Sequence, residues 1–138
     1  MAYELRSPES DSEWRAYHDI RRTVLWESRG RFGVYDESHP DEYKPNHFPK
    51  LLCLNDLPIG VIRIDILDET AWFRRVAIIE NLQREGHGRV LIHESEKFAR
   101  KQGAKRVESL VDRDAIGFYR KLGFESNDGD ESAMYKPL

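Results

Sequence analysis

The residues Gln83-Arg84-Glu85-Gly86-His87-Gly88 form the pattern in this chain that is best suited to binding an anion. Glycine adopts left-handed conformations at little cost, so two glycines let the backbone curl close to a ligand. The six residues follow an apolar strand pattern and precede an amphipathic helix pattern. The first turn of that helix leaves N–H groups without partners, and the helix dipole adds positive potential. The spacing therefore predicts a phosphate or pyrophosphate site.

Two known nucleotide-binding loops do not fit these residues. No Lys-Ser or Lys-Thr pair follows Gly88, and the third glycine of the dinucleotide fingerprint is absent. The alternative that remains is a tight turn between a strand and a helix without any ligand.

The elements that must position this loop are predicted from the spacing of apolar residues. Ser10 and Glu13 form a capping-box pattern at the start of the first helix. In the second long strand, Ile62, Ile64 and Ile66 share one face, and Arg63 and Asp65 share the other. The predicted elements are a strand at 3–6, a helix at 12–26, a long loop at 28–49, strands at 50–54, 59–67 and 70–79, a helix at 88–102, a strand at 106–111, a helix at 114–122 and a hairpin at 125–136.

The order of these elements predicts an α+β fold with three layers. A strand, a long helix and another strand at the centre imply a parallel pair joined by a right-handed βαβ crossover. The other strands follow one another closely and are expected to be antiparallel. We therefore expect a mixed, mostly antiparallel central sheet with helices on both faces, in one domain over residues 1–138.

Composition narrows the class of protein. The net charge is −3, which argues against a nucleic-acid binder that depends on a basic excess. No apolar run resembles a signal peptide or a membrane span, so no membrane partner is expected. Cys53 is the single cysteine and excludes an internal disulfide. We expect a cytoplasmic protein in a reducing environment.

Two segments carry a resemblance to a known family. Val76-Ala77-Ile78, followed by Gln83-x-x-Gly86-x-Gly88, resembles the acetyl-CoA motif of the GNAT superfamily of N-acetyltransferases. The segment A-I-G-F-Y-R-K-L-G-F at 115–124 resembles the later motif of the same family. The order of elements agrees over nearly the whole chain, and the specific likeness runs from about Ala71 to Phe124.

The resemblance implies roles for particular residues. The backbone of Val76 to Ile78 would bind the pantetheine arm of acetyl-CoA like an added strand. Tyr119 would lie near the sulfur and protonate the departing thiolate, because a tyrosine with a pKa of about 10 keeps its proton at neutral pH. The alternative is that Tyr119 is a core residue with its hydroxyl at the surface. The implied cofactor-binding residues are Val76, Ala77, Ile78, Gln83, Arg84, Glu85, Gly86, His87, Gly88, Arg89 and Asp112.

The chain departs from the family pattern at three positions. Glu80 stands where a proline is common, and Asp112 stands where an asparagine is common. Trp72 stands where a carboxylate often acts as the general base. The candidate bases that remain are Asp65, Glu69 and Glu108, or a water molecule held by backbone carbonyls.

Charged residues near these motifs suggest further contacts. Strand alternation predicts that Arg74 and Arg75 point to opposite faces, where one approaches the cofactor or a substrate carboxylate, or both are solvated. Arg84, Arg89 and Lys101 are candidates for contacts with the cofactor phosphates.

The acidic stretch from Asp36 to Glu42 lies in the long loop, a region that lines the acceptor side in this family. It would attract a cationic amine, unless it is only a solvated run of charge. The five histidines do not have the spacing of metal ligands, so no metal is expected.

The combined interpretation is an acetyl-CoA-dependent N-acetyltransferase that moves an acetyl group to a primary amine by direct attack in a ternary complex. Acetyl-CoA would be a co-substrate, and the acceptor would be a small-molecule amine or a peptide amine. Two alternatives stay open, namely a non-catalytic acyl-CoA sensor and an enzyme that acetylates protein N-termini or lysines. The sequence is compatible with both a monomer and a homodimer.

Overall fold

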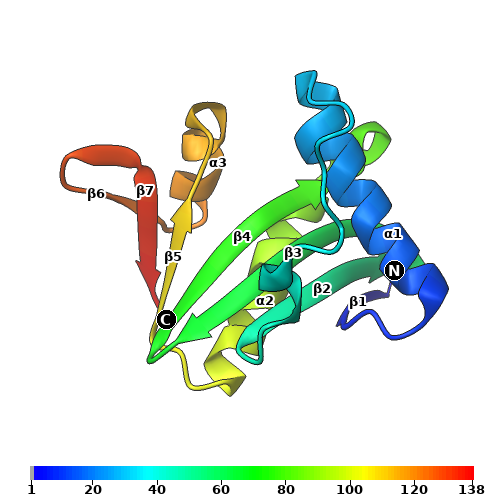
Figure 1. Ribbon diagram of the computed structural model, residues 1–138. Helices are drawn as coiled ribbons and strands as arrows, with labels where there is room; N and C mark the ends of the chain where they lie inside the picture. The colour runs from blue at the N-terminus through cyan, green and yellow to red at the C-terminus, as the bar shows by residue number, and fades with distance from the viewer. Residues whose placement is uncertain (1) are drawn as a thin grey trace.

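The computed structural model describes residues 2–138 and is built on a seven-stranded mixed sheet (Figure 1). The strand order is β1-β2-β3-β4-β5-β7-β6. Only β4 and β5 are parallel, and the other neighbours are antiparallel. The strands are β1 (Tyr3–Arg6), β2 (His47–Leu54), β3 (Leu57–Leu67), β4 (Thr70–Ile78), β5 (Arg106–Leu110), β6 (Glu125–Asn127) and β7 (Asp130–Pro137).

Helices cover both faces of the sheet, which confirms the predicted layers. On one face, α1 (Asp11–Arg21) packs on a small core that contains Tyr17, Leu51 and Val61. On the other face, α2 (His87–Lys101) and α3 (Ile116–Lys121) cover the larger core. The predicted crossover is α2, which connects β4 to β5 (Figure 1). No helix within residues 2–138 is both long enough and apolar enough to cross a membrane.

The first helix begins where the sequence predicts and changes from α-helical to π-helical near its end. Ser10 accepts a hydrogen bond from the N–H of Glu13 at 3.2 Å, and the Glu13 carboxylate accepts from the N–H of Ser10, so the capping box is formed. The chain then continues as a π-helical segment, η1 (Arg22–Trp26), and a 3₁₀ turn, η2 (Glu27–Arg29). Gly30 ends this segment with a φ of 77°, a left-handed value that suits glycine.

The second strand begins three residues earlier than predicted. Pro49 lies inside β2, although a proline lacks the N–H that a paired strand requires. The position tolerates proline because β1 pairs only with Leu51 to Leu54, which leaves the outer edge of β2 at Pro49 without a neighbouring strand.

Both faces of β3 are buried, and the two faces differ in chemistry. Ile62 and Ile64 belong to the larger core, as the alternation predicts. Arg63 and Asp65 point to the opposite face and are 7% and 6% exposed. That face is covered by the long loop, which contains one 3₁₀ turn, η3 (Pro40–Tyr43). A buried, charged surface therefore lies under this loop.

The strands β4 and β5 pair only over a short distance and then separate. Their parallel pairing covers Thr70 to Trp72 of β4. Just beyond it, the hydroxyl of Ser109 donates a hydrogen bond to the carbonyl of Phe73 at 2.9 Å. No further pairing joins the two described strands past this bridge, so β4 presents an open edge from Arg74 onward (Figure 1).

Candidate functional site

The glycine loop has the backbone geometry that its sequence predicts. Gly86 is the N-cap of α2 with a φ of 90°, and Arg84 also has a left-handed φ of 65°. The side-chain amide of Gln83 donates to the carbonyl of Ile78 at 2.9 Å, which ties the loop to the end of β4. The short 3₁₀ turn η4 (Glu80–Leu82) precedes the loop, and Glu80 takes the place of the family proline there.

The N-terminal turn of α2 leaves several amides without partners in the helix. Its first hydrogen bond runs from the N–H of Val90 to the carbonyl of Gly86, so the N–H groups at 87–89 have no acceptor within the helix. The ring of Phe118 lies 3.3 Å from where a Cβ on Gly88 would stand. Glycine therefore suits position 86 by its conformation, and at position 88 it leaves room for the Phe118 ring.

The structure adds a contact for His87 and corrects the role predicted for Lys101. The His87 ring is buried, and its Nδ1 lies 2.8 Å from the hydroxyl of Tyr3, so the loop is linked to β1. Lys101 is the last residue of α2 and lies about 20 Å along the helix from the glycine loop. The expectation that Lys101 helps to bind the phosphates is wrong, because it stands at the opposite end of the helix.

The open edge of β4 carries the backbone groups expected to bind a pantetheine arm. The N–H of Ile79 donates to the carbonyl of Ile59, which lies in β3, so the backbone of Ile79 faces β3. Because hydrogen-bonded and non-bonded pairs alternate in an antiparallel ladder, the N–H and C=O groups of Val76 and Ile78 face away from β3. The contact of Gln83 with the Ile78 carbonyl agrees with this direction. Ala77 instead faces β3.

Tyr119 lines a narrow cavity of about 130 Å³ in the opening between β4 and β5. The side chain is 5% exposed, and Val76 and Asp112 line the same cavity. Burial and, secondarily, the nearby Asp112 carboxylate raise the pKa of the Tyr119 hydroxyl above its ordinary value of 10. Asp112 is held by Arg29, whose Nη2 donates to its carboxylate at 2.5 Å. Tyr119 therefore keeps its proton at neutral pH.

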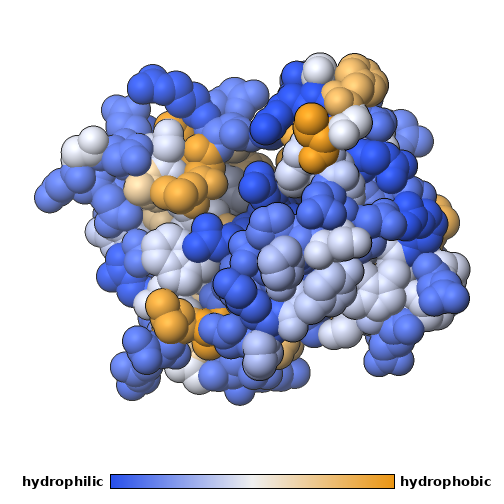
Figure 2. All heavy atoms as spheres, viewed as in Figure 1, coloured by the Kyte–Doolittle hydropathy of each residue, from blue (hydrophilic) through white to orange (hydrophobic). Residues whose placement is uncertain are grey.

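A second, larger cavity of about 840 Å³ lies between the long loop, η1 and the strands β3 and β4. Phe73, Arg75 and Leu110 line both cavities, so the two meet at these residues. Figure 2 shows a hollow between the half of the molecule that contains β5, β7 and α3 and the half that contains α1. A molecule in the larger cavity can therefore approach a group held in the opening between β4 and β5.

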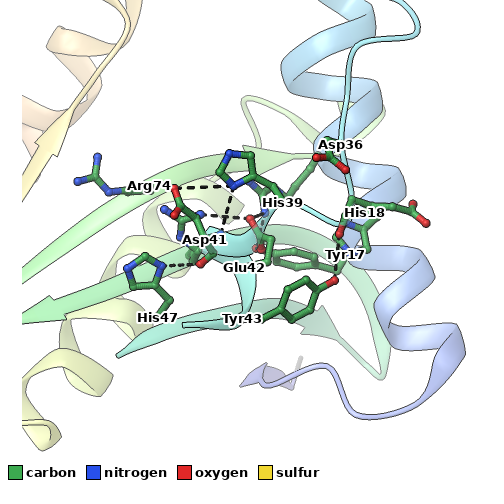
Figure 3. Close-up of polar contacts among 12 residues, drawn as sticks. Tyr17, His18, Asp36, His39, Asp41, Glu42, Tyr43, His47 and Arg74 are labelled. Atoms are coloured by element: carbon green, nitrogen blue, oxygen red, sulfur yellow. Dashed lines mark hydrogen bonds and ion pairs between the residues drawn. The ribbon is translucent and has the colours of Figure 1, made fainter. Parts of the chain in front are cut away.

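A buried ionic network closes one side of the larger cavity (Figure 3). Glu42 on η3 accepts hydrogen bonds from the Tyr17 hydroxyl at 2.8 Å and from the guanidinium groups of Arg21 and Arg63. Burial acts to raise the pKa of Glu42, but these guanidinium groups and hydrogen bonds lower it overall. The Nε of Arg21 is buried and has no acceptor within residues 2–138.

Asp65 is the only expected base that lines either cavity, and basic groups surround it. Arg63 binds it through two hydrogen bonds of 2.8 Å, and the Nε of Arg74 donates to it at 3.0 Å. The other two candidates lie outside both linings: Glu69 pairs with Lys105, and Glu108 lies near Arg106 on β5. Trp72 does line the larger cavity, in the place of the family carboxylate.

Arg74 and Arg75 do not point to opposite faces, so this prediction is wrong. Both side chains line the larger cavity, and the guanidinium of Arg75 lies 4.9 Å from the centre of the Trp26 ring. The cause is an irregularity in the pairing of β3 with β4, where Arg75 has a φ of 57°. Such a bulge adds one residue to the strand and interrupts its alternation.

The acidic stretch in the long loop is largely neutralised by its neighbours. Asp41 pairs with Lys44 at 2.9 Å, and Glu37 forms a surface ion pair with Arg15. Glu42 belongs to the buried network, and Asp36 accepts from the N–H of Ser38. The loop lines the larger cavity, and most of its negative charge is already paired.

Sequence reasoning missed several residues of the larger cavity. Arg21 and Trp26 reach it from α1 and η1, and Tyr35 reaches it from the loop. The hydroxyl of Tyr35 lies 2.5 Å from Nδ1 of His18, and burial raises its pKa to about 12. Glu42 lies in a loop without a regular pattern, so the sequence gives no signal for the network that it forms with Arg21 and Arg63. Within residues 2–138, no three His, Cys, Asp or Glu side chains gather as a metal site would require.

Comparison with known proteins agrees with this geometry. The pattern of the acetyltransferase (GNAT) family matches residues 3–124. A Bacillus subtilis (strain 168) protein provisionally named an acetyltransferase is 26% identical over 122 residues, which cover 85% of this chain and 80% of that protein.

Two solved structures share the fold over the full chain. One is the PaiA N-acetyltransferase of Thermoplasma acidophilum, solved in complex with coenzyme A. It has a TM-score of 0.76 at 21% identity, and the alignment covers 100% of each chain. A provisionally named N-acetyltransferase from Lactobacillus plantarum has a TM-score of 0.80 at 25% identity, over 100% of this chain and 99% of the other. Together with the family match over most of its length, these likenesses show that the chain belongs to the acetyltransferase (GNAT) family.

Proposed function

We propose that this protein is an acetyl-CoA-dependent N-acetyltransferase that acts on a small primary amine. The single observation that carries the proposal is the meeting of the two cavities at Phe73, Arg75 and Leu110. One cavity holds Tyr119 beside the open edge of β4, and the other is large enough for an acceptor. A thioester in the first cavity and an amine in the second would be brought into contact, which supplies much of the rate gain.

The cofactor would be bound mainly by backbone groups. The free amides at 87–89 and the glycine loop fit a pyrophosphate, because they offer several N–H donors at a helix N-terminus. The outward-facing N–H and C=O groups of Val76 and Ile78 fit the two amides of the pantetheine arm. Gln83 and Asp112 would support this arrangement from the loop and from the narrow cavity.

The reaction would be a direct transfer. The neutral amine nitrogen attacks the thioester carbonyl carbon, a C–N bond forms, and the C–S bond breaks. The oxygen that gains charge would be stabilised by a β4 amide, that of Ile78. Tyr119 would give its proton to the departing thiolate, and the amine would release a proton to water. Tyr119 carries its proton at neutral pH, as a group that protonates a thiolate must.

The size of the acceptor cavity supports a small molecule over a protein substrate. Its volume of about 840 Å³ lies within the range of roughly 300 to 1,000 Å³ typical of small-molecule sites. Buried groups of the ionic network close one side, so the acceptor region is a concave pocket.

The proposal is tested by incubating the purified protein with acetyl-CoA and a panel of primary amines. Release of the free thiol of CoA is measured with a colorimetric thiol reagent, and the acetylated product is identified by mass spectrometry. The expected result is thiol release that depends on an amine and matches the amount of acetylated product. Tight binding of acetyl-CoA without transfer to any amine would instead identify a non-catalytic acyl-CoA-binding protein.

A further inference from the structure

Arg75 is the basic residue placed nearest to the meeting point of the two cavities. It lines both of them, and its guanidinium lies over the ring of Trp26. Within residues 2–138, no carboxylate lies within ion-pair distance of Arg75, although most other arginines of the site have such partners. Its position follows from the bulge in β4, so the backbone directs this unpaired cation into the site.

The surroundings of Arg75 have an excess of positive charge. The arginine cluster consists of Arg21, Arg63, Arg74 and Arg75, and all four line the larger cavity. These four guanidinium groups share only two carboxylates, those of Glu42 and Asp65.

The excess extends beyond the cluster. The other charged residues of the lining are Lys44 with its partner Asp41, and Asp36, so five basic side chains face four acidic ones in the whole cavity. Burial and the charges of nearby arginines lower the pKa of Arg75, which is the expected response to a cationic environment without a counter-ion.

We infer that the acceptor is an amine that also carries a carboxylate, and that Arg75, assisted by Arg74, binds this carboxylate. The inference rests on the proposed function, because it names the acceptor class of the same site. A guanidinium group binds a carboxylate through two parallel hydrogen bonds, which fixes orientation as well as charge. A carboxylate at Arg75 would hold the amine of an amino acid only a few bonds away, beside Val76 and the opening that contains Tyr119.

The same cluster explains how an amine can react although Trp72 replaces the usual carboxylate. Positive charge around a bound amine disfavours its ammonium form, so the neutral and nucleophilic form is favoured. The carboxylate of the acceptor would be attracted by the cluster, while its amine would be encouraged to lose a proton. A plain diamine or polyamine has no carboxylate to pair with Arg75 and would bind less tightly than an amino acid.

The inference is tested with matched acceptors. Initial rates of acetyl transfer are measured for a panel of amino acids and for the carboxamide of each one, which has the same amine and side chain without the negative charge. We expect kcat/KM for the best amino acid to exceed that of its amide by about tenfold or more, in line with the cost of losing hydrogen bonds to a charged group. Amides that react as well as the acids would contradict the inference and leave the proposed function intact.

Two arginine variants separate a direct contact from a general effect of charge. Arg75→Gln should reduce the acid-to-amide ratio of kcat/KM to near one. Arg31→Gln is the matched control: Arg31 is exposed, lies outside both linings, and its charge nevertheless acts on Arg75. This control should keep the ratio. An equal fall in both variants would mean that no specific contact exists.

Titration of each variant with acetyl-CoA completes the test. Arg75→Gln should bind acetyl-CoA as tightly as the wild type. Weaker binding of acetyl-CoA with an unchanged acid-to-amide ratio would assign Arg75 to the cofactor and overturn the inference. Transfer to other primary amines but to no amino acid would overturn the inference alone, whereas transfer to no primary amine would overturn the proposed function together with it.

Discussion

The proposed cofactor side and the proposed acceptor side of this site are built in different ways. On the cofactor side, the glycine loop and the edge of β4 present backbone N–H and C=O groups, and the side chains mainly permit the required backbone. On the acceptor side, the lining is dominated by charged and aromatic side chains from η1, the long loop, β3 and β4. Backbone recognition depends on local conformation, whereas side-chain recognition depends on residues far apart in the chain.

This difference predicts how the two sides respond to substitution. On the cofactor side, the sensitive positions are glycines, because a Cβ or a changed φ disturbs the ligand-binding backbone. On the acceptor side, the sensitive positions are buried charges, because the loss of one partner leaves another charge without compensation. The predictions below test this contrast, beginning with the largest effect.

Glu42→Gln should lower the free energy of unfolding by about 3 kcal/mol, because Arg21 and Arg63 would lose a buried carboxylate partner. Chemical denaturation followed by circular dichroism measures this change. Glu37→Gln is the control in the same loop, since Glu37 pairs with Arg15 at the exposed surface. The control should leave stability unchanged, and equal losses in the two variants would contradict the assigned importance of burial.

The stabilising effect of Glu42 should also depend on pH. The pKa of Glu42 in the folded protein lies below its ordinary value of 4.5, so its carboxylate contributes stability above that pH. The contribution is lost as the pH falls below 4.5 and through the lower folded pKa. The difference in unfolding free energy between wild type and Glu42→Gln should therefore be constant near neutral pH and shrink in acid. A difference that grows in acid would have the wrong sign.

Tyr119→Phe should lower kcat about 100-fold, the scale of a lost general acid, with little change in the affinity for acetyl-CoA. Steady-state kinetics and calorimetry measure the two quantities separately. Tyr43→Phe serves as the control, because Tyr43 is 59% exposed and lies outside both cavity linings. A Tyr119→Phe enzyme with full activity would remove the hydroxyl from the mechanism.

Gly88→Ala should weaken acetyl-CoA binding about tenfold, because the new methyl group would meet the Phe118 ring at 3.3 Å beside the free amides. Gly117→Ala is the matched control in α3, since its added methyl group would have no neighbour within 4 Å. Calorimetric dissociation constants compare the two. Equal affinities would mean that the close approach of Phe118 has no bearing on the cofactor.

The backbone of the proposed cofactor side could be predicted from the sequence because its determinants are local. Gly86 and Gly88 stand between a strand pattern and a helix pattern, and the structure gives Gly86 the left-handed conformation that this position requires. The antiparallel pairing of β2, β3 and β4 was also predictable, because these strands are joined by short turns such as Asn55-Asp56, where both residues have positive φ.

The acceptor side could not be predicted because its contacts are distant in sequence. Glu42 reaches Arg21 and Arg63, each 21 residues away, through a loop that has no regular pattern. The bulge at Arg75 has no sequence signal either, since a strand pattern continues through it, and it reversed the predicted direction of one arginine. The excess of positive charge in the cavity therefore became visible only once the loop, the helix and the strands were assembled.

The measurement that most directly tests the central claim is a calorimetric titration of the wild type and of Gly86→Glu with acetyl-CoA. We predict saturable binding in the micromolar range for the wild type and none for the variant, because glutamate is strained at a φ of 90° and repels phosphate. Circular dichroism establishes that the variant is folded. No binding of millimolar acetyl-CoA to the wild type, or equal binding to the variant, would mean that the glycine loop is only a turn.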